Sequence, residues 1–255
     1  MSLPQKYNCP RLVEPLTLDG FISDPAWQAV PWTDDFQDIT GDPALKPRFR
    51  TRVKMAWDDT YFYVAAEMEE PHVWGTITKQ NEVVFHDNDF EVFIDPDADA
   101  RNYYEFEINA LGTIWELNLP VPYSDGGVPL LGCNFPGLVR KVGVRGTLND
   151  PADVDEGWCV EIAFPWSALA KYNLDRPTPP APDDIWKVNF SRVQWQHEVV
   201  DGEYVRIPPH GTEMSQALNP EDQEHPEDNW VWSPQGAVNM HIPEHWGEVV
   251  FKELC

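Results

Sequence analysis

The sequence predicts an all-β fold, a two-sheet antiparallel β-sandwich with a few short helices. Three observations support this prediction. Apolar and polar residues alternate over many short stretches, turn-forming residues separate several of those stretches, and helical signals are few. Many strands that each bury one face, with few helices, are typical of two packed sheets. The 255 residues suit one such domain, and the resemblance described below implies a core at about residues 10–252.

The predicted strands follow this two-residue period. In TRVKMAW, the apolar Val53, Met55 and Trp57 alternate with the basic Arg52 and Lys54. The stretches YFYVAAEME, NDFEVFID and NYYEFEINA repeat the pattern, so each should bury one face and expose the other. Further strands are predicted at residues 113–119, 138–146, 158–164, 186–195 and 247–252.

Two short helices and two long loops complete the predicted order. Asp24 followed by Pro25 is a typical helix start, and PWSALAKY after Phe164 indicates a second helix. The proline-rich residues 176–184 form a loop within the domain, because the strand pattern resumes directly after them. Residues 210–229 form a long polar loop, a kind that often carries function.

The charge and the cysteines exclude several classes of function. With 43 acidic and 18 basic residues the net charge is −25, which repels phosphate backbones and makes nucleic acid an improbable partner. No C-x-x-C pair occurs, so a zinc ribbon and a thioredoxin-type motif are excluded, while one disulfide stays open among Cys9, Cys133, Cys159 and Cys255. No apolar stretch is long enough for a transmembrane helix.

The first ten residues, MSLPQKYNCP, lack the apolar segment of a signal peptide. That absence does not establish a cytoplasmic location, since a signal peptide could be missing from a mature exported chain. We expect an extracellular or periplasmic protein.

Five basic residues at alternate positions stand out in this acidic chain. Lys46, Arg48, Arg50, Arg52 and Lys54 would line one strand face. The favoured interpretation is an edge strand protected by charge. The alternative is a docking face for an acidic polymer such as a uronic-acid glycan.

The acidic stretch FIDPDADARNYYEFEIN is the most informative segment. Asp95, Asp97 and Asp99 have the spacing with which an EF-hand loop begins, but Ala100 and Phe106 stand where that loop needs Gly and Glu. The EF-hand interpretation therefore fails. The three carboxylates could still bind a structural calcium ion, and a solvated turn between two strands is the alternative.

A catalytic function for this segment is the first rival hypothesis. Glu105 and Glu107 lie two apart on one strand, so they share a face, and Glu91 is expected on the same face of the neighbouring strand. A glycoside hydrolase needs two such carboxylates with pKa values pushed apart. The sequence shows no environment that would raise the pKa of either carboxyl, which argues against catalysis.

Seven segments in order resemble carbohydrate-binding module family 9, most closely its free-standing family 9-like branch. They are LDGFISDPAW, VKMAWDDTYFYVAAEMEEP, DNDFEVFIDPD, NYYEFEINALGT, GWCVEIAFPWSAL, WKVNFSRVQW and WSPQGAVNMHIPEHWGEVVF. The resemblance implies a β-sandwich that binds sugars without cleaving them and carries structural calcium. In the family, two tryptophans clamp a terminal sugar while strand side chains hydrogen-bond its hydroxyls.

The family's binding residues carry over to this chain in part. The resemblance places the strand glutamate at Glu91 and the asparagine at Asn109, while Glu107 stands where the family has an arginine. The first clamp position falls on Phe85. The second falls on Met240, or on Trp232 if the loop is shifted in register.

The sequence thus predicts a non-catalytic carbohydrate-binding protein that supports glycan breakdown. Its predicted sugar site is the face carrying Phe85, Glu91, Glu107 and Asn109, covered by the loop from Trp232 to Met240. The second rival is an interaction or scaffold domain that binds a protein partner and no sugar.

Overall fold

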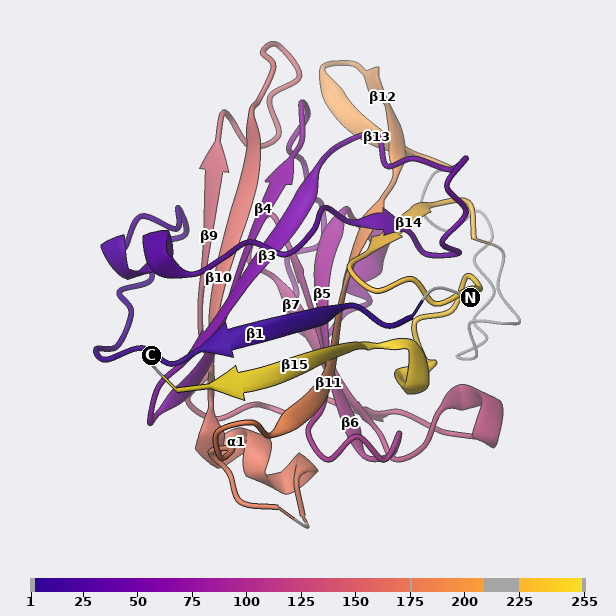
Figure 1. Ribbon diagram of the computed structural model, residues 1–255. Coiled ribbons are helices and arrows are strands. Elements are labelled where there is room, and N and C mark those ends of the chain that lie inside the picture. Colours follow the sequence, from indigo (N-terminus) through magenta and orange to yellow (C-terminus); the bar gives the residue numbers. More distant parts are fainter. Residues whose placement is uncertain (1–2, 175, 209–224, 254–255) are drawn as a thin grey trace.

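Two β-sheets stack on one another in the computed structural model, which describes residues 3–174, 176–208 and 225–253 (Figure 1). The larger sheet has the order β1 (Lys6–Pro10), β15 (Gly247–Lys252), β11 (Ile185–Gln194), β5 (Asp89–Asp95), β6 (Tyr103–Asn109), β7 (Ile114–Leu119) and β8 (Leu130–Leu131). β14 (Asp228–Val231) also pairs with β11, and β2 (Gln37–Asp38) pairs with β14. The smaller sheet has the order β3 (Thr51–Trp57), β4 (Tyr61–Glu69), β10 (Gly157–Pro165) and β9 (Val139–Arg145).

The core lies between the two sheets and is lined by the predicted inward positions, whereas the other face of β5, β6, β7 and β10 is also buried and not exposed as predicted. Phe106 of β6 packs edge to face on Phe164 of β10, with ring centroids 5.7 Å apart. The ring centroids of Phe62 of β4 and Trp186 of β11 are 6.3 Å apart. Such aromatic pairs add to the free energy gained by burying their area. The inward positions of each strand are fully buried, as for Val92 of β5. The all-β sandwich prediction is therefore confirmed.

The pairing of β1 with β15 departs from the antiparallel prediction. These strands run parallel and side by side, with Tyr7 opposite Val249, although they come from opposite ends of the chain (Figure 1). A separate hairpin, β12 (Gln196–Val200) and β13 (Glu203–Ile207), forms a third small sheet. The sequence contains its signal, since Asp201-Gly202 between two apolar runs is typical of a tight hairpin turn.

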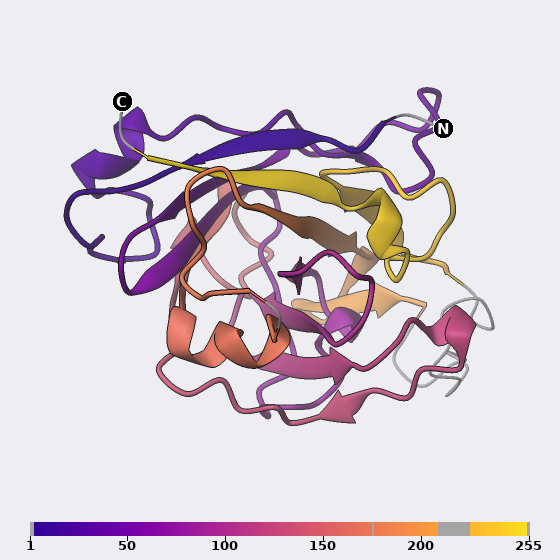
Figure 2. The same ribbon diagram turned by 60° about the horizontal axis from the view of Figure 1, so that its bottom comes forward.

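The helical segments are as short as the sequence predicts. Asp24 accepts a hydrogen bond from the Ala26 N–H at 2.9 Å and begins the 3₁₀ turn Pro25–Ala29. α1 (Trp166–Leu169) follows β10 directly and continues as the 3₁₀ turn Ala170–Tyr172 at one end of the sheets (Figure 2). In the part of the chain that the structure describes, further 3₁₀ turns span Val84–His86, Tyr123–Asp125 and Pro243–His245. Among the described residues, no helix has the length and apolar character to span a membrane.

The basic stripe does not form the strand face that the sequence predicts. β3 begins at Thr51, so only Arg52 and Lys54 of the five bases belong to the strand, at an edge of the smaller sheet. Arg52 pairs with Glu67 at 2.8 Å, and the Lys54 ammonium donates to the Trp27 carbonyl. Arg48 pairs with Asp228 at 2.7 Å. The carboxylates that pair with Arg48 and Arg52 offset part of the positive charge of the stripe, which weakens the argument for a docking face.

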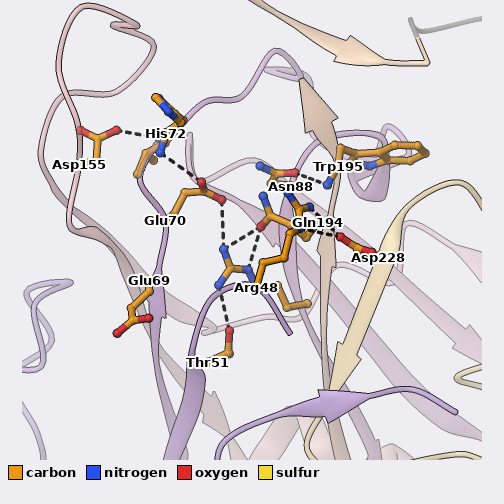
Figure 3. Close-up of polar contacts among 12 residues, drawn as sticks. Arg48, Thr51, Glu69, Glu70, His72, Asn88, Asp155, Gln194, Trp195 and Asp228 are labelled. Atoms are coloured by element: carbon orange, nitrogen blue, oxygen red, sulfur yellow. Dashed lines mark hydrogen bonds and ion pairs between the residues drawn. The ribbon is translucent and has the colours of Figure 1, made fainter. Parts of the chain in front are cut away.

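One ion pair is wholly buried near the end of β11. The Arg192 guanidinium donates to Glu70 at 3.1 Å, to Thr51 at 3.0 Å and to Gln194 at 2.7 Å. Figure 3 shows these three partners, Glu70, Thr51 and Gln194, close together. Burial lowers the pKa of Arg192 to about 10, so the side chain stays charged at neutral pH. The polar cluster thus fixes β11 against the segments carrying Thr51 and Glu70.

The cysteine thiols of the described residues are free. Cys9 and Cys159 are buried and Cys133 is half-buried, and none of the three forms a disulfide. Cys255 and most of the polar loop at 210–229 lie outside the described residues.

Candidate functional site

Two neighbouring strands place four carboxylates on the face of the larger sheet that points away from the inter-sheet core. Asp89 and Glu91 of β5 alternate with the core residues Phe90 and Val92. Glu91 lies directly opposite Glu107 of β6, and Glu105 precedes Glu107 by two positions on the same strand. The predicted common face of Glu91, Glu105 and Glu107 is confirmed. We call Asp89, Glu91, Glu105 and Glu107 the carboxylate cluster.

The carboxylate cluster is buried, which the sequence does not predict. Each of its four side chains is at most 5% exposed. Segments distant in sequence help to cover the face: Val84 and Met240 belong to the apolar group that packs here with Phe93 and Trp246. A charged group in such surroundings loses its hydration, so the neutral form is favoured.

Burial raises the pKa of every member of the cluster. The pKa of Glu91 rises to about 7, mainly through burial. The pKa values of Asp89, Glu105 and Glu107 are raised well above the ordinary range, first by burial and then by the neighbouring carboxylates, Glu91 foremost. The expectation that no environment raises these pKa values is therefore wrong, because covering segments remove water from the face.

Only some of the carboxylate oxygen atoms of the cluster accept a hydrogen bond. Glu107 accepts a bond from the Phe85 N–H at 3.1 Å. Among the described residues, both carboxylate oxygens of Asp89 and the Oε2 atom of Glu105 are buried without a hydrogen-bond partner. His241 lies 3.9 Å from Glu105, but burial lowers its pKa to about 3, so the imidazole is neutral at ordinary pH.

Aromatic side chains border the cluster. Phe85, half-buried, packs against Trp115 of β7 with ring centroids 6.0 Å apart. Trp115 lies opposite Glu107 in the β6–β7 pairing and therefore on the same face. Half-buried Tyr123 contacts His241 at 4.5 Å. Aromatic surface beside hydrogen-bond acceptors suits a sugar, whose ring has C–H faces and hydroxyl edges.

Serine and asparagine from the next strands add polar groups to this face. Ser191 of β11 lies opposite Glu91, and its hydroxyl donates to Asn229 of β14 at 2.8 Å. The nearby Glu227 carboxylate helps to raise the pKa of Glu91. The sequence analysis missed Asp89, Trp115 and Ser191 as site residues. The alternation in NDFEVFID does place Asp89 with Glu91, and that in TIWELNL places Trp115 with Leu117 and Leu119.

The remaining residues of the predicted sugar site have other surroundings. Asn109 is on the predicted face, but its oxygen accepts from the Leu111 and Thr113 N–H groups, while its amide donates to the Ile77 carbonyl and to Asp87. These bonds order the β6–β7 turn. Met240 is buried, and its carbonyl accepts from the Trp246 indole at 2.7 Å.

Trp232 lies on the opposite side of the larger sheet. Its ring packs in the inter-sheet core against Phe190 at 5.9 Å and Tyr7 at 6.5 Å, and it is 2% exposed. The proposal that it replaces a clamp ring over the carboxylates therefore conflicts with its position. The physical reason is the period of two, since Trp232 shares its side with Trp230, whereas Val231 faces the carboxylate side.

The aspartate loop after β5 brings its three carboxylates together. Oxygen atoms of Asp95, Asp97 and Asp99 all lie within 4.8 Å of one another. Asp95 accepts from the Ala98 and Ala100 N–H groups at 3.1 and 2.9 Å, and burial raises its pKa to about 7. This arrangement is also compatible with an ordinary acidic turn.

Comparisons with known proteins identify the family of this chain and similar folds. The family model described as carbohydrate family 9 binding domain-like matches residues 18–178. An exoglucanase, XynX, from Acetivibrio thermocellus is 25% identical over 120 residues, which cover 47% of this chain and only 9% of that enzyme.

Solved structures share the fold along nearly the whole chain. A candidate carbohydrate-binding protein from Bacteroides uniformis has a TM-score of 0.64 at 16% identity, covering 97% of this chain and 99% of that one. A family 9 carbohydrate-binding module from Caldicellulosiruptor kristjanssonii, solved with cellotriose, has a TM-score of 0.55 at 15% identity, covering 98% and 95%. The same organism's module with glucose gives 0.56 at 14% identity, covering 98% and 97%.

Proposed function

Because this chain belongs to the carbohydrate family 9 binding domain-like family, we propose that it binds a neutral oligosaccharide, without cleaving it, at the carboxylate cluster and its aromatic border. The observation that carries the placement is the direct opposition of Glu91 and Glu107 beside Phe85 and Trp115. Carboxylates accept hydrogen bonds from sugar hydroxyls, and aromatic rings pack on the C–H face of a pyranose.

The charge of the face argues for neutral rather than acidic sugars. Several buried carboxylates gather there, and among the described residues no lysine or arginine forms an ion pair with Asp89, Glu91 or Glu107. Any of these carboxyls that is ionised would repel a uronic acid, whereas a neutral sugar meets no such repulsion. Glu107 stands where the resemblance implies an arginine. Losing that positive charge also favours neutral over acidic sugars.

Replacing Glu91 by alanine is expected to weaken oligosaccharide binding about tenfold, because a hydrogen bond between the carboxyl group and a sugar hydroxyl is lost. A screen of neutral and acidic oligosaccharides, followed by calorimetric titration of the best ligand, measures this change. Glu14→Ala is the matched control, since Glu14 lies on an exposed loop. Equal affinities of Glu91→Ala and Glu14→Ala, with both variants folded, would contradict the placement of the site.

Hydrolysis through Glu91, Glu105 and Glu107 is the second candidate function. The raised pKa values favour it, since a carboxyl that stays protonated near neutral pH can act as a general acid. Family membership favours binding alone. We expect no new reducing ends when the protein is incubated with its best-bound oligosaccharide between pH 5 and 8. Release that disappears in Glu91→Ala would establish the enzyme instead.

Structural calcium at Asp95, Asp97 and Asp99 belongs to the same proposal. Hard oxygen ligands within a few ångströms of one another support it. The double variant Asp97→Asn with Asp99→Asn should then lose a bound calcium ion and show a lower unfolding temperature in calcium buffer.

A protein partner in place of a sugar would be indicated by failure of the folded chain to bind any oligosaccharide. We further propose that the protein acts outside the cytoplasm, in support of glycan breakdown.

A further inference from the structure

A second group of carboxylates, separate from the aspartate loop, converges within the cluster. Asp89, Glu91 and Glu107 each offer an oxygen atom, and these atoms all lie within 4.8 Å of one another. All three side chains are buried, at 0%, 5% and 1% exposure. Three negative charges so close together in a buried place repel one another strongly unless protons or a cation compensate them.

The unsatisfied side chain of Asp89 is a second observation that points to a ligand at this place. Its side chain is fully buried, yet neither Oδ1 nor Oδ2 has a hydrogen-bond partner of ordinary geometry among the described residues, and the nearby Val193 backbone favours the ionised form only weakly against burial. Leaving a buried carboxylate without a partner costs several kilocalories per mole, so such groups are rare in folded proteins. The same face carries a third such atom, the Oε2 of Glu105.

We propose that Asp89, Glu91 and Glu107 bind a divalent cation of the calcium type at the base of the proposed sugar site. The binding of this cation does not depend on the proposed function, whereas its contribution to sugar affinity rests on it. The site is distinct from the aspartate loop, because Asp89, Glu91 and Glu107 come from the paired strands β5 and β6 rather than from the turn that joins them.

The donor set and its spacing favour calcium over other metals. A point between three oxygens that are all within 4.8 Å of one another lies no more than about 2.8 Å from each, near the 2.3–2.6 Å of calcium–oxygen bonds. Magnesium needs shorter, stricter octahedral bonds, and zinc prefers nitrogen and sulfur ligands. The Nδ1 atom of the nearby His241 forms a hydrogen bond with the Tyr103 hydroxyl at 3.0 Å. Its Nε2 atom faces Glu105 rather than the three proposed ligands.

A cation held by three carboxylates would leave positions for other oxygen ligands. Calcium takes six to eight oxygens, so water or adjacent sugar hydroxyls could complete the shell. The two positive charges of the cation would offset most of the negative charge of its three ligands when they are ionised. The competing state is protonation, which burial favours because it raises the pKa of all three carboxyls.

Calcium titration of chelator-treated protein by calorimetry tests the cation site. The variants are Glu107→Gln, which removes a charge but keeps an acceptor for the Phe85 N–H, and the loop variant Asp97→Asn with Asp99→Asn. Glu14→Gln is the control. We expect Glu107→Gln to bind one calcium ion fewer than wild type, or to bind it at least tenfold more weakly, while the loop variant keeps that ion. Identical titrations of wild type and Glu107→Gln, with or without binding, would overturn the proposal.

Repeating the sugar titration in calcium and in EDTA separates the two proposals. Calcium binding that Glu107→Gln weakens, without sugar binding in either buffer, would support the cation site and contradict the proposed function. Sugar binding in both buffers, with no calcium bound at the cluster, would support the proposed function and contradict the cation site. If both proposals hold, EDTA weakens sugar binding by wild type and has less effect on Glu107→Gln.

Discussion

Replacing Arg192 by methionine is expected to lower the free energy of unfolding by about 3–5 kcal/mol, because Glu70 is left as a buried charge without its partner. The side chains of this ion pair are 1% and 2% exposed, and the guanidinium also binds Thr51 and Gln194. Methionine fills a similar volume, so the loss reflects charge and hydrogen bonding rather than a cavity. Denaturant unfolding monitored by tryptophan fluorescence measures the change.

An exposed ion pair provides the matched comparison. Lys79 and Glu82 lie 2.9 Å apart on the surface, and exposed pairs contribute little. Lys79→Met should therefore change stability by less than about 1 kcal/mol. Adding Glu70→Gln to Arg192→Met should restore part of the loss by removing the unpaired charge. If Arg192→Met is as stable as Lys79→Met, the buried network does not stabilise the fold as described.

Replacing Trp232 by alanine is expected to destabilise the protein by about 3–5 kcal/mol, as for other large aromatic residues of a core. The ring packs on Tyr7 and Phe190 and lies against Gly247, where an added Cβ atom would come within 2.2 Å of it. A glycine at this position of β15 therefore makes room for the indole. Thermal and denaturant unfolding of the variant measure the loss.

A milder substitution distinguishes a core role from a sugar contact. Trp232→Phe keeps most of the buried area, so the variant should fold and bind oligosaccharide with the affinity of wild type. Loss of affinity by a stable Trp232→Phe protein would mean that this ring contacts the sugar, contrary to its position in the core.

The sequence predicted the strands well where one face alternates strictly. In β5 and β6 the period of two separates the core residues from the carboxylates, and the structure has the same division. The same rule applied to Trp230, Val231 and Trp232 would have placed Trp232 in the core. The family resemblance proposed a clamp role there instead, since it compares spacing and not the side of a strand.

The register and the burial of the site could not be read from the sequence. Glu91 lies opposite Glu107 because the turn after Asp95 sets the register of β5 and β6. In that turn Ala98 and Ala100 adopt positive φ angles of 60° and 63°, which no turn motif in the sequence predicts. The segments that cover the carboxylates, around Val84 and Met240, are far away in the chain. The pKa of a carboxyl depends on such covering, so the raised values were missed.

The most direct test of the carboxylate face as the sugar site is an NMR titration of the tryptophan indole N–H signals with the best-bound neutral oligosaccharide. Trp115 lies on that face, and a Trp115→Phe variant assigns its signal. The Trp27 indole donates to Glu161 at 2.8 Å in a different apolar cluster and serves as the internal control. We predict that the Trp115 signal shifts in a saturable way while the Trp27 signal stays in place. Saturable binding that moves Trp27 and leaves Trp115 unchanged would contradict the account.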